Sequence, residues 1–292
     1  MPTPVSPLGL LLDVDGPIAS PITRTIATPG ILTDLITLAA GHVPIAFITG
    51  RSAGFIREQV VAPLVAAGLP ETFRMYAVCE KGAVWFPIER NGMGDVAVDR
   101  DVALPPAVVD DVRQLVTQSF ASEMFFDETK QAMISVEQRT DVSQSDFRAR
   151  QPEFNTAVFA ILVKHGLGVR FNELESADAS GEIPFRLDAT IISTDIESVT
   201  LDKDHAAKRV LAYFAQGGPL PRLWRSVGDS RSDYRMADHL HEAGYDVSHV
   251  DVRPSDGILE RPYPVIVIGD QIHDEAGATF LRHWVDKLAL PA

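Results

Sequence analysis

An apolar run of strand length ends in two aspartates in the sequence G-L-L-L-D-V-D-G, residues 9–16. Side chains alternate faces along a strand, so Asp13 and Asp15 share a face only if the chain stays extended, and Gly16 favours a turn instead. With a turn at Asp15, both carboxylates stand at the carboxyl edge of a sheet, where open α/β folds bind their ligands. Because two carboxylates in one crevice repel each other, three interpretations are open: a divalent metal site, an acid/base pair, or a strand that ends in an ordinary D-x-D-G turn.

Three further short stretches follow in the chain. They are I-T-G-R at 48–51, Lys203 at the start of a predicted helix, and G-D-S-R-S-D at 228–233. Each is weak alone, but in this order after D-x-D-G they resemble the four motifs of the haloacid dehalogenase-like (HAD) phosphohydrolase superfamily. The resemblance spans roughly residues 8–240.

Composition limits the classes of partner and compartment. The 292 residues are 46% hydrophobic, which suffices for a packed core, and 26 basic against 40 acidic residues give a formal charge of -14. This charge disfavours nucleic acid and anionic membranes as partners. No segment approaches the ~20 apolar residues of a membrane span, and M-P-T-P-V-S-P lacks a basic region, so we expect a cytoplasmic protein. The single Cys79 excludes an internal disulfide and is expected in the core.

Strand and helix patterns alternate at both ends of the chain. A helix is predicted at 31–40, a buried strand ends at Thr49, a second helix spans 53–67, and a third strand covers 73–79. The alternation resumes after Leu201. This order predicts a parallel sheet with right-handed crossovers.

The middle of the chain has a different pattern, with strands in pairs and two helices. Such a pattern suggests a separate α+β unit, which we place at 84–199, inserted into a core formed by 1–83 and 200–292. The acidic stretch 173–181 is the expected flexible loop. The candidate strands are 83–86, 123–127, 131–137, 168–172 and 186–194, and the candidate helices are 105–120 and 153–165.

An insertion at this place resembles the C2-type cap of the superfamily. The sequence E-K-G-A at 80–83 is similar to the E-N-G-A entrance of that cap, with Lys81 in place of asparagine. The resemblance is to the Cof-like branch (subclass IIB), which includes trehalose-phosphate phosphatases, sucrose-phosphate phosphatases and phosphomannomutases. It implies an α/β fold, with a Rossmann-like parallel-sheet HAD core and an inserted α+β cap.

Phosphoryl transfer requires a nucleophile, a proton for the leaving oxygen, charge neutralisation and in-line positioning. The resemblance implies that Asp13 is the nucleophile and forms an aspartyl-phosphate, and that Asp15 is the general acid and base. Thr49 and Gly50 would bind phosphate, although a T-G turn between strand and helix is also an ordinary structural feature. Arg51 would either hold substrate or pair with an acid.

Lys203 would neutralise the nucleophile and the phosphoryl oxygens, although a lone lysine at a helix start is usually a solvated surface residue. Lys208 is the competing candidate, and its place inside the helix suggests a surface position. Pro17 departs from the family pattern, in which threonine follows D-x-D-G, and it removes a backbone donor.

The same resemblance implies a Mg²⁺ site made by Asp13, the backbone carbonyl of Asp15, Asp229 and Asp233, where Asp233 either ligates the ion or holds a bound water. Oxygen ligands in an octahedral set suit this ion. The sequence G-D-Q-I-H-D at 269–274 repeats the spacing of 228–233. We prefer 228–233, because one helix separates it from the lysine motif and a helix follows it.

In the expected cap, Glu128, Lys130 and Arg139 resemble an E-x-K…R segment that contacts sugar in trehalose-phosphate-type caps. Alternating exposed charges on a half-buried sheet are the simpler interpretation.

The leading hypothesis is a Mg²⁺-dependent phosphatase acting on a small phosphate ester, a sugar phosphate above all, as a monomer or homodimer without nucleic-acid or membrane partners. The alternatives are a phosphomutase of the phosphomannomutase type and a phosphometabolite-binding protein with weakened catalysis. A receiver-type phospho-acceptor domain also uses Asp, Thr and Lys, but it has no need of a cap.

Overall fold

The computed structural model describes residues 6–291, so residues 1–5 of the expected core and Ala292 lie outside the described part. The chain divides into two compact units. Unit 1 ends at Ala97 and resumes at Asp202, and unit 2 runs Val98–Leu201 between these two segments.

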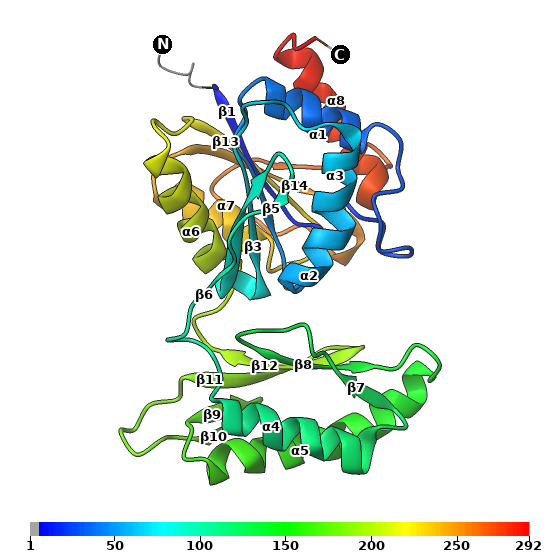
Figure 1. Cartoon of the computed structure of the whole chain (residues 1–292), viewed down its shortest axis with the longest axis vertical. Coiled ribbons are helices and arrows are strands. Elements are labelled where there is room, and N and C mark those ends of the chain that lie inside the picture. The colour runs from blue at the N-terminus through cyan, green and yellow to red at the C-terminus, as the bar shows by residue number, and fades with distance from the viewer. Residues whose placement is uncertain (1–5, 292) are drawn as a thin grey trace. The chain divides into compact units, whose positions relative to one another are not determined.

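Unit 1 contains one sheet in the order β15-β14-β13-β1-β2-β3-β4-β5, with β6 paired to β4 (Figure 1). The pairs from β15 to β3 are parallel, and those of β4 with β3 and β5 are antiparallel. The predicted parallel sheet is therefore confirmed for unit 1. The strands are β1 Leu8–Leu12, β2 Ile45–Ile48, β3 Met75–Cys79, β4 Val84–Glu89, β5 Gly92–Met93, β6 Ala97–Val98, β13 Leu223–Gly228, β14 Asp246–Asp251 and β15 Val265–Ile266.

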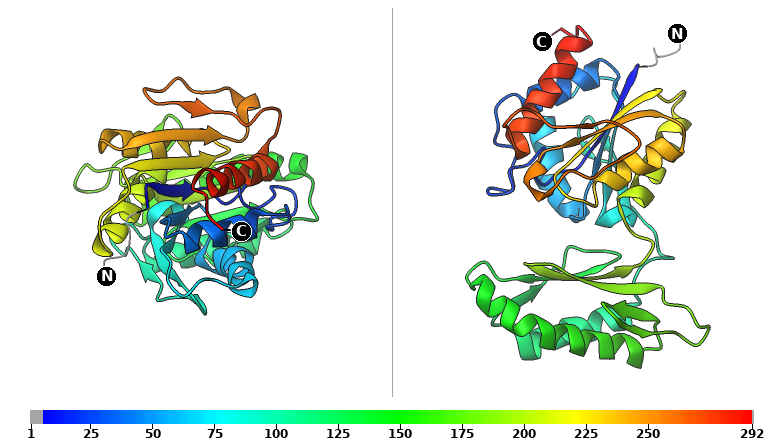
Figure 2. Two further views of the ribbon diagram at one scale, coloured as in Figure 1. Left: turned by 90° about the horizontal axis from the view of Figure 1, so that it is seen from above. Right: turned by 180° about the vertical axis from the view of Figure 1, so that it is seen from behind.

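Helices cover both faces of this sheet. The helix α6 packs on α7 at one face, and α1 packs on α8 and α3 at the other (Figures 1 and 2). The segments α2, η1 and α3 follow one another without a break, as the prediction of a helix over 53–67 required. The helices are α1 Ile31–Ala40, α2 Ala53–Ile56, η1 Arg57–Val61, α3 Ala62–Ala67, η2 Glu80–Gly82, α6 Lys203–Gln216, α7 Tyr234–Glu242, η4 Pro254–Asp256 and α8 His273–Lys287.

The strand β1 lies inside the sheet between β13 and β2, and all five of its residues are buried. A strand covered on both faces reads as a continuous apolar run, which explains the sequence L-G-L-L-L. Gly9 is required by a close approach, because a Cβ at this position would stand 2.6 Å from the Trp224 ring. The burial of β1 fixes the place where Asp13 leaves the sheet.

Unit 2 contains a second sheet, in the order β10-β9-β11-β12-β8-β7. The helices α4 and α5 lie on one face of it (Figure 1), and an apolar cluster joins them to the sheet. Only the β9–β11 pair is parallel among the strand pairs of this sheet within residues 6–291. The elements are α4 Pro106–Leu115, η3 Val116–Phe120, β7 Met124–Phe126, β8 Ile134–Gln138, α5 Gln144–Lys164, β9 Val169–Phe171, β10 Leu174–Ser176, β11 Phe185–Ala189 and β12 Ser193–Ser198.

The first boundary between the units differs from the expected one at 83–84. The strand β4 pairs antiparallel with β3, with Trp85 beside Val78 and Phe86 beside Ala77, so it extends the sheet of unit 1. The change from alternating to paired strands in the sequence thus begins before the boundary, which lies at Ala97. The second boundary, at Leu201, is within two residues of the expectation.

Local hydrogen bonds account for three other differences in unit 2. The helix α5 begins earlier than the predicted 153–165, because Ser143 caps it by accepting from the Asp146 amide at 3.2 Å. The predicted strand 186–194 is a hairpin, whose turn Thr190 closes by bonding the Ser193 amide at 2.9 Å. The expected flexible loop 173–181 contains β10 and an Asp178 turn.

No helix within residues 6–291 combines the length and the apolar character that crossing a membrane requires.

Candidate active site

Asp13 follows β1 directly and lies at the carboxyl edge of the sheet. Its amide donates to the carbonyl of Val227 at 2.9 Å, which continues the register of β1 with β13, and its side chain is buried. Gly16 has φ +99°, and a Cβ there would stand 2.8 Å from Cγ of Asp229. The turn predicted after Asp15 therefore needs glycine both for its backbone and for the aspartate that lies against it.

Pro17 fits the loop without loss of a hydrogen bond that the loop uses. The loop is closed by the amide of Gly16 to the carbonyl of Ala19 at 2.9 Å, and by the amide of Ala19 to the carbonyl of Val14 at 2.7 Å. Neither bond needs an amide at position 17. Pro17 also packs under α8, where a Cβ at Gly277 would stand 1.8 Å from its carbonyl oxygen.

The turn after β2 carries Thr49, Gly50 and Arg51. Thr49 is buried, and its hydroxyl oxygen accepts from the amide of Arg51 at 3.0 Å. The guanidinium of Arg51 binds both carboxylate oxygens of Asp15 at 3.0 Å, which is the bidentate geometry of a strong ion pair. Of the two interpretations of Arg51, the structure contains the one in which it pairs with an acid.

Lys203 is a buried residue, in contrast to the surface position that a lone lysine at a helix start usually has. Its amide is capped by the Asp202 carboxylate at 2.7 Å, which sets the start of α6. Its Nζ lies 2.6 Å from Asp13 Oδ1 and 2.8 Å from Asp233 Oδ1, and it donates to the carbonyl of Ile48 at 2.9 Å. The competing Lys208 is exposed on α6.

Asp233 organises the loop after β13. Its Oδ2 accepts from the amides of Asp229 and Ser230 at 3.0 and 2.9 Å and from the Ser230 hydroxyl at 2.7 Å. Gly228 makes room for it, since a Cβ there would stand 2.2 Å from Cβ of Asp233. The Oδ1 of Asp233 lies 2.8 Å from Lys203 Nζ but is buried without a hydrogen-bond partner among the described residues, so this oxygen can ligate an ion or hold a bound water.

Burial and neighbouring charges shift the pKa values of four side chains at the site. Burial raises the pKa of Asp13 well above its usual value, with Asp233 adding to the effect and Lys203 opposing it. Burial lowers the pKa of Lys203, but Asp13 and Asp233 outweigh it and raise this pKa above its usual value. Burial raises the pKa of Asp229 to about 6, and Asp233 adds to it. Burial likewise favours a raised pKa for Asp233, but Lys203 outweighs it and holds this pKa below its usual value.

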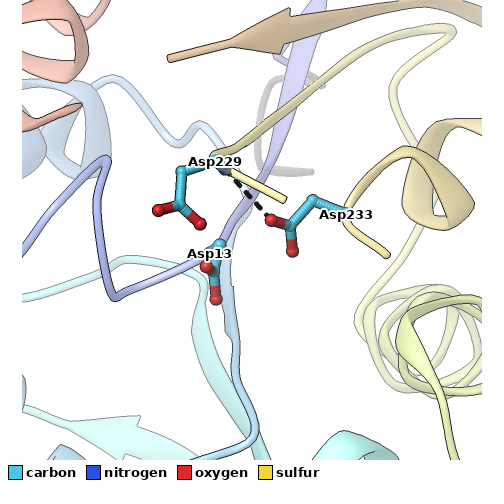
Figure 3. A group of neighbouring side chains, drawn as sticks. All are labelled: Asp13, Asp229 and Asp233. Atoms are coloured by element: carbon cyan, nitrogen blue, oxygen red, sulfur yellow. Dashed lines mark hydrogen bonds between the residues drawn. The ribbon is translucent and has the colours of Figure 1, made fainter. Parts of the chain in front are cut away.

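A divalent cation fits this cluster. Asp13, Asp229 and Asp233 each offer one oxygen, and these atoms lie within 4.8 Å of one another (Figure 3). Opposite oxygens around Mg²⁺ stand about 4 Å apart, so small side-chain movements bring the donors into one shell. The side chain of Asp15 is outside this group and faces Arg51, which is compatible with the expected use of its backbone carbonyl.

Two residues near Asp229 were not among the sequence candidates. Arg253 Nη1 lies 3.7 Å and His273 Nδ1 lies 3.9 Å from Asp229 Oδ2. The only sequence signal for Arg253 is its place just after the end of β14. His273 is the first residue of α8, has φ +51° and lies within the repeat 269–274. The spacing of that repeat does not predict this left-handed conformation.

The aspartates of that repeat lie outside the cluster. Asp270 is exposed, and Asp274 accepts a hydrogen bond from the Thr28 hydroxyl at 2.5 Å.

The three sugar-contact candidates lie in unit 2, two of them at one end of β8 and the third at the other. Glu128 and Lys130 are in the turn between β7 and β8, whereas Arg139 follows the far end of β8. Five strand residues separate the two ends by about 16 Å. Glu128 is paired with Arg113 at 2.8 Å, and Arg139 with Asp141 at 2.9 Å. Their proposed role stays a prediction.

The fold that carries this site is that of the HAD-like hydrolases, as comparisons with solved structures show. The chain is similar to the C-terminal domain of C. albicans trehalose-6-phosphate phosphatase, with 14% identity, a TM-score of 0.61, and coverage of 96% of this chain and 93% of that one. It is also similar to a HAD-like hydrolase from Bacteroides thetaiotaomicron, with 10% identity, a TM-score of 0.57, and coverage of 94% and 98%.

A third similar structure is the sucrose-phosphatase of Synechocystis sp. in complex with sucrose and phosphate. Its identity is 16%, its TM-score 0.50, and the coverage 98% of this chain and 99% of that one. No protein-family model and no curated protein sequence matches the chain. The expectation of a HAD fold, drawn from four short motifs, is thus confirmed by structure where sequence comparison finds nothing.

Proposed function

We propose that the protein is a Mg²⁺-dependent phosphatase that hydrolyses a small phosphate ester through an aspartyl-phosphate on Asp13. One observation carries the proposal: the buried ammonium of Lys203 lies between the carboxylates of Asp13 and Asp233, at 2.6 and 2.8 Å, at the carboxyl edge of a parallel sheet. A buried Lys–Asp arrangement beside two more carboxylates is poorly explained as a device for stability. Well-packed apolar side chains at the same places would stabilise a fold at least as well.

Asp13 attacks the phosphorus atom in the first step, and the bond from phosphorus to the ester oxygen breaks. Asp15 donates a proton to that oxygen, and in the second step it takes a proton from the water that attacks the aspartyl-phosphate. Free phosphate leaves, and Asp13 is restored. Because Arg51 holds both oxygens of Asp15, this role requires the carboxylate to rotate away from Arg51.

The remaining residues of the site bind the phosphoryl group and neutralise its charge. Lys203 offsets the charge of Asp13 and of the phosphoryl oxygens, and the Thr49–Gly50 turn offers backbone and hydroxyl donors to them. Asp13 and Asp229 would hold Mg²⁺ with the Asp15 carbonyl, while Asp233 fixes the loop. When bound, the ion supplies charge stabilisation to the phosphoryl group in the transition state.

A sugar phosphate is the substrate class we propose, because two of the similar structures are phosphatases of trehalose 6-phosphate and of sucrose phosphate. Unit 2 would act as the cap, with Glu128, Lys130 and Arg139 as contacts.

A panel of phosphate esters tests the proposal by the release of inorganic phosphate. We expect release from at least one sugar phosphate with Mg²⁺, none with EDTA, and recovery when Mg²⁺ is restored. Absence of release from every ester, with p-nitrophenyl phosphate included and Mg²⁺ present, would overturn it.

A further inference from the structure

The turn after β3 has a strained backbone. Glu80 and Lys81 are consecutive residues with φ of 48° and 54°, and Gly82 follows with φ 115°. Left-handed backbone is uncommon for residues other than glycine, and asparagine tolerates it better than lysine does. Such strain gathers at functional sites. The E-N-G-A pattern that 80–83 resembles has asparagine at position 81. The chain has lysine there, although the left-handed backbone favours asparagine.

The turn is bonded directly to the candidate phosphate turn. The amide of Glu80 donates to the carbonyl of Arg51, and the amide of Lys81 donates to the carbonyl of Thr49, both at 3.1 Å. On its other side, Arg209 donates to the carbonyl of Gly82 at 3.0 Å. The position of Lys81 relative to Thr49 and Gly50 is therefore set by backbone bonds within unit 1.

The side chain of Lys81 runs along Gly50. Its Cε and Cγ lie 3.8 and 3.9 Å from the point where a Cβ on Gly50 would stand. Its ammonium is one bond beyond Cε, and so it lies close to the turn that carries Thr49 and Gly50. Lys203 reaches the same turn from α6, through its bond to the carbonyl of Ile48.

The charges of the site leave a role for a further cation. Asp13, Asp15, Asp229 and Asp233 provide four carboxylates, and Lys203, Arg51 and Arg253 provide three cations. A divalent cation gives this set one positive charge, and a phosphate dianion then leaves one negative charge. The formal charge of the whole chain is -14, so the overall charge does not offset this excess.

We propose that Lys81 is a further substrate-binding residue, whose ammonium contacts the phosphoryl oxygens of an ester bound at the Thr49–Gly50 turn and of the phosphate product. This inference rests on the proposed function, since it assigns a residue to the same site.

The test compares Lys81→Asn, Lys81→Arg and the control Lys208→Asn, which removes an exposed lysine of α6. Asparagine removes the charge and suits the left-handed backbone, so Lys81→Asn should melt near the wild-type temperature. We expect Lys81→Asn to raise KM for p-nitrophenyl phosphate, and Ki and Kd for inorganic phosphate, by about 10- to 100-fold, as for loss of a charge-assisted hydrogen bond. The change in kcat should be much smaller.

Lys81→Arg should keep most of the affinity, and Lys208→Asn should be unchanged. An inorganic-phosphate Kd in Lys81→Asn within twofold of wild type, measured by calorimetry with Mg²⁺, would overturn the inference. If no ester is hydrolysed, the proposed phosphatase fails, and the calorimetric Kd of inorganic phosphate still decides the role of Lys81.

Discussion

Replacing Lys203 with methionine should destabilise the protein strongly at neutral pH. The ammonium is buried, and it is the cation that lies between the carboxylates of Asp13 and Asp233. Removal of one partner of a buried ion pair leaves an uncompensated buried charge, and it typically costs about 3–5 kcal/mol. Since domains are stable by only about 5–15 kcal/mol, the loss should be plain in urea unfolding at pH 7 with EDTA present.

The pH dependence of this loss follows from the same carboxylates. In the wild type, Lys203 holds the pKa of Asp233 below its usual value, so the stabilisation is present above the unfolded pKa and is lost as pH falls through the folded pKa. The difference in free energy of unfolding between wild type and Lys203→Met should therefore be largest near pH 7. It should decrease toward pH 4, where the freed carboxylates protonate.

Two further measurements separate charge from packing. Exposed Lys208→Met should change the free energy of unfolding by less than about 0.5 kcal/mol. Mg²⁺ at 100 times its Kd should restore about 2.7 kcal/mol to Lys203→Met by binding the folded state. A loss below about 1 kcal/mol for Lys203→Met at pH 7 would refute the idea that this lysine neutralises two buried carboxylates.

Three other results are expected. Gly9→Ala places a Cβ 2.6 Å from the Trp224 ring. Urea unfolding should show that overpacking lowers the free energy of unfolding by about 1–3 kcal/mol. An unchanged midpoint would contradict the packing of β1. Asp229→Ala should abolish Mg²⁺ binding in calorimetry while Asp270→Ala leaves it unchanged, and the reverse pattern would assign the ion to the second repeat. Asp15→Asn should reduce the burst of leaving group by about 10²–10⁴-fold on a sugar phosphate but much less on p-nitrophenyl phosphate, whose phenolate needs no proton; equal losses would remove Asp15 from the acid role.

The parts of the fold predictable from sequence are those set by local patterns. The apolar run of β1 and the alternation on either side of it predict a parallel sheet, and Asp13, Thr49, Lys203 and Asp229 each follow a strand or open a helix. Carboxyl ends of parallel strands meet at one edge, so the order of elements alone brings these residues together.

The features that were not predictable depend on partners distant in sequence. The boundary at Ala97 is set by the pairing of β4 with β3, which an isolated strand pattern does not reveal. Pairing of Arg51 with an acid was one of two expectations, but its partner Asp15, like the approach of Arg253 to Asp229, depends on a long-range side-chain contact. The left-handed backbone at Lys81 accompanies hydrogen bonds to the turn after the neighbouring strand β2. The periodicity of the sequence does not predict these bonds.

The most direct test of the proposed function is whether Asp13 becomes phosphorylated. The protein is mixed with Mg²⁺ and p-nitrophenyl phosphate, quenched in acid within the first turnover, digested, and analysed by mass spectrometry. We expect one added phosphoryl group on the peptide that contains Asp13, with none in Asp13→Asn and none when EDTA replaces Mg²⁺. Steady release of phosphate by the wild type with no phosphoryl group on that peptide, or release that persists in Asp13→Asn, would contradict the assignment of Asp13 as the nucleophile.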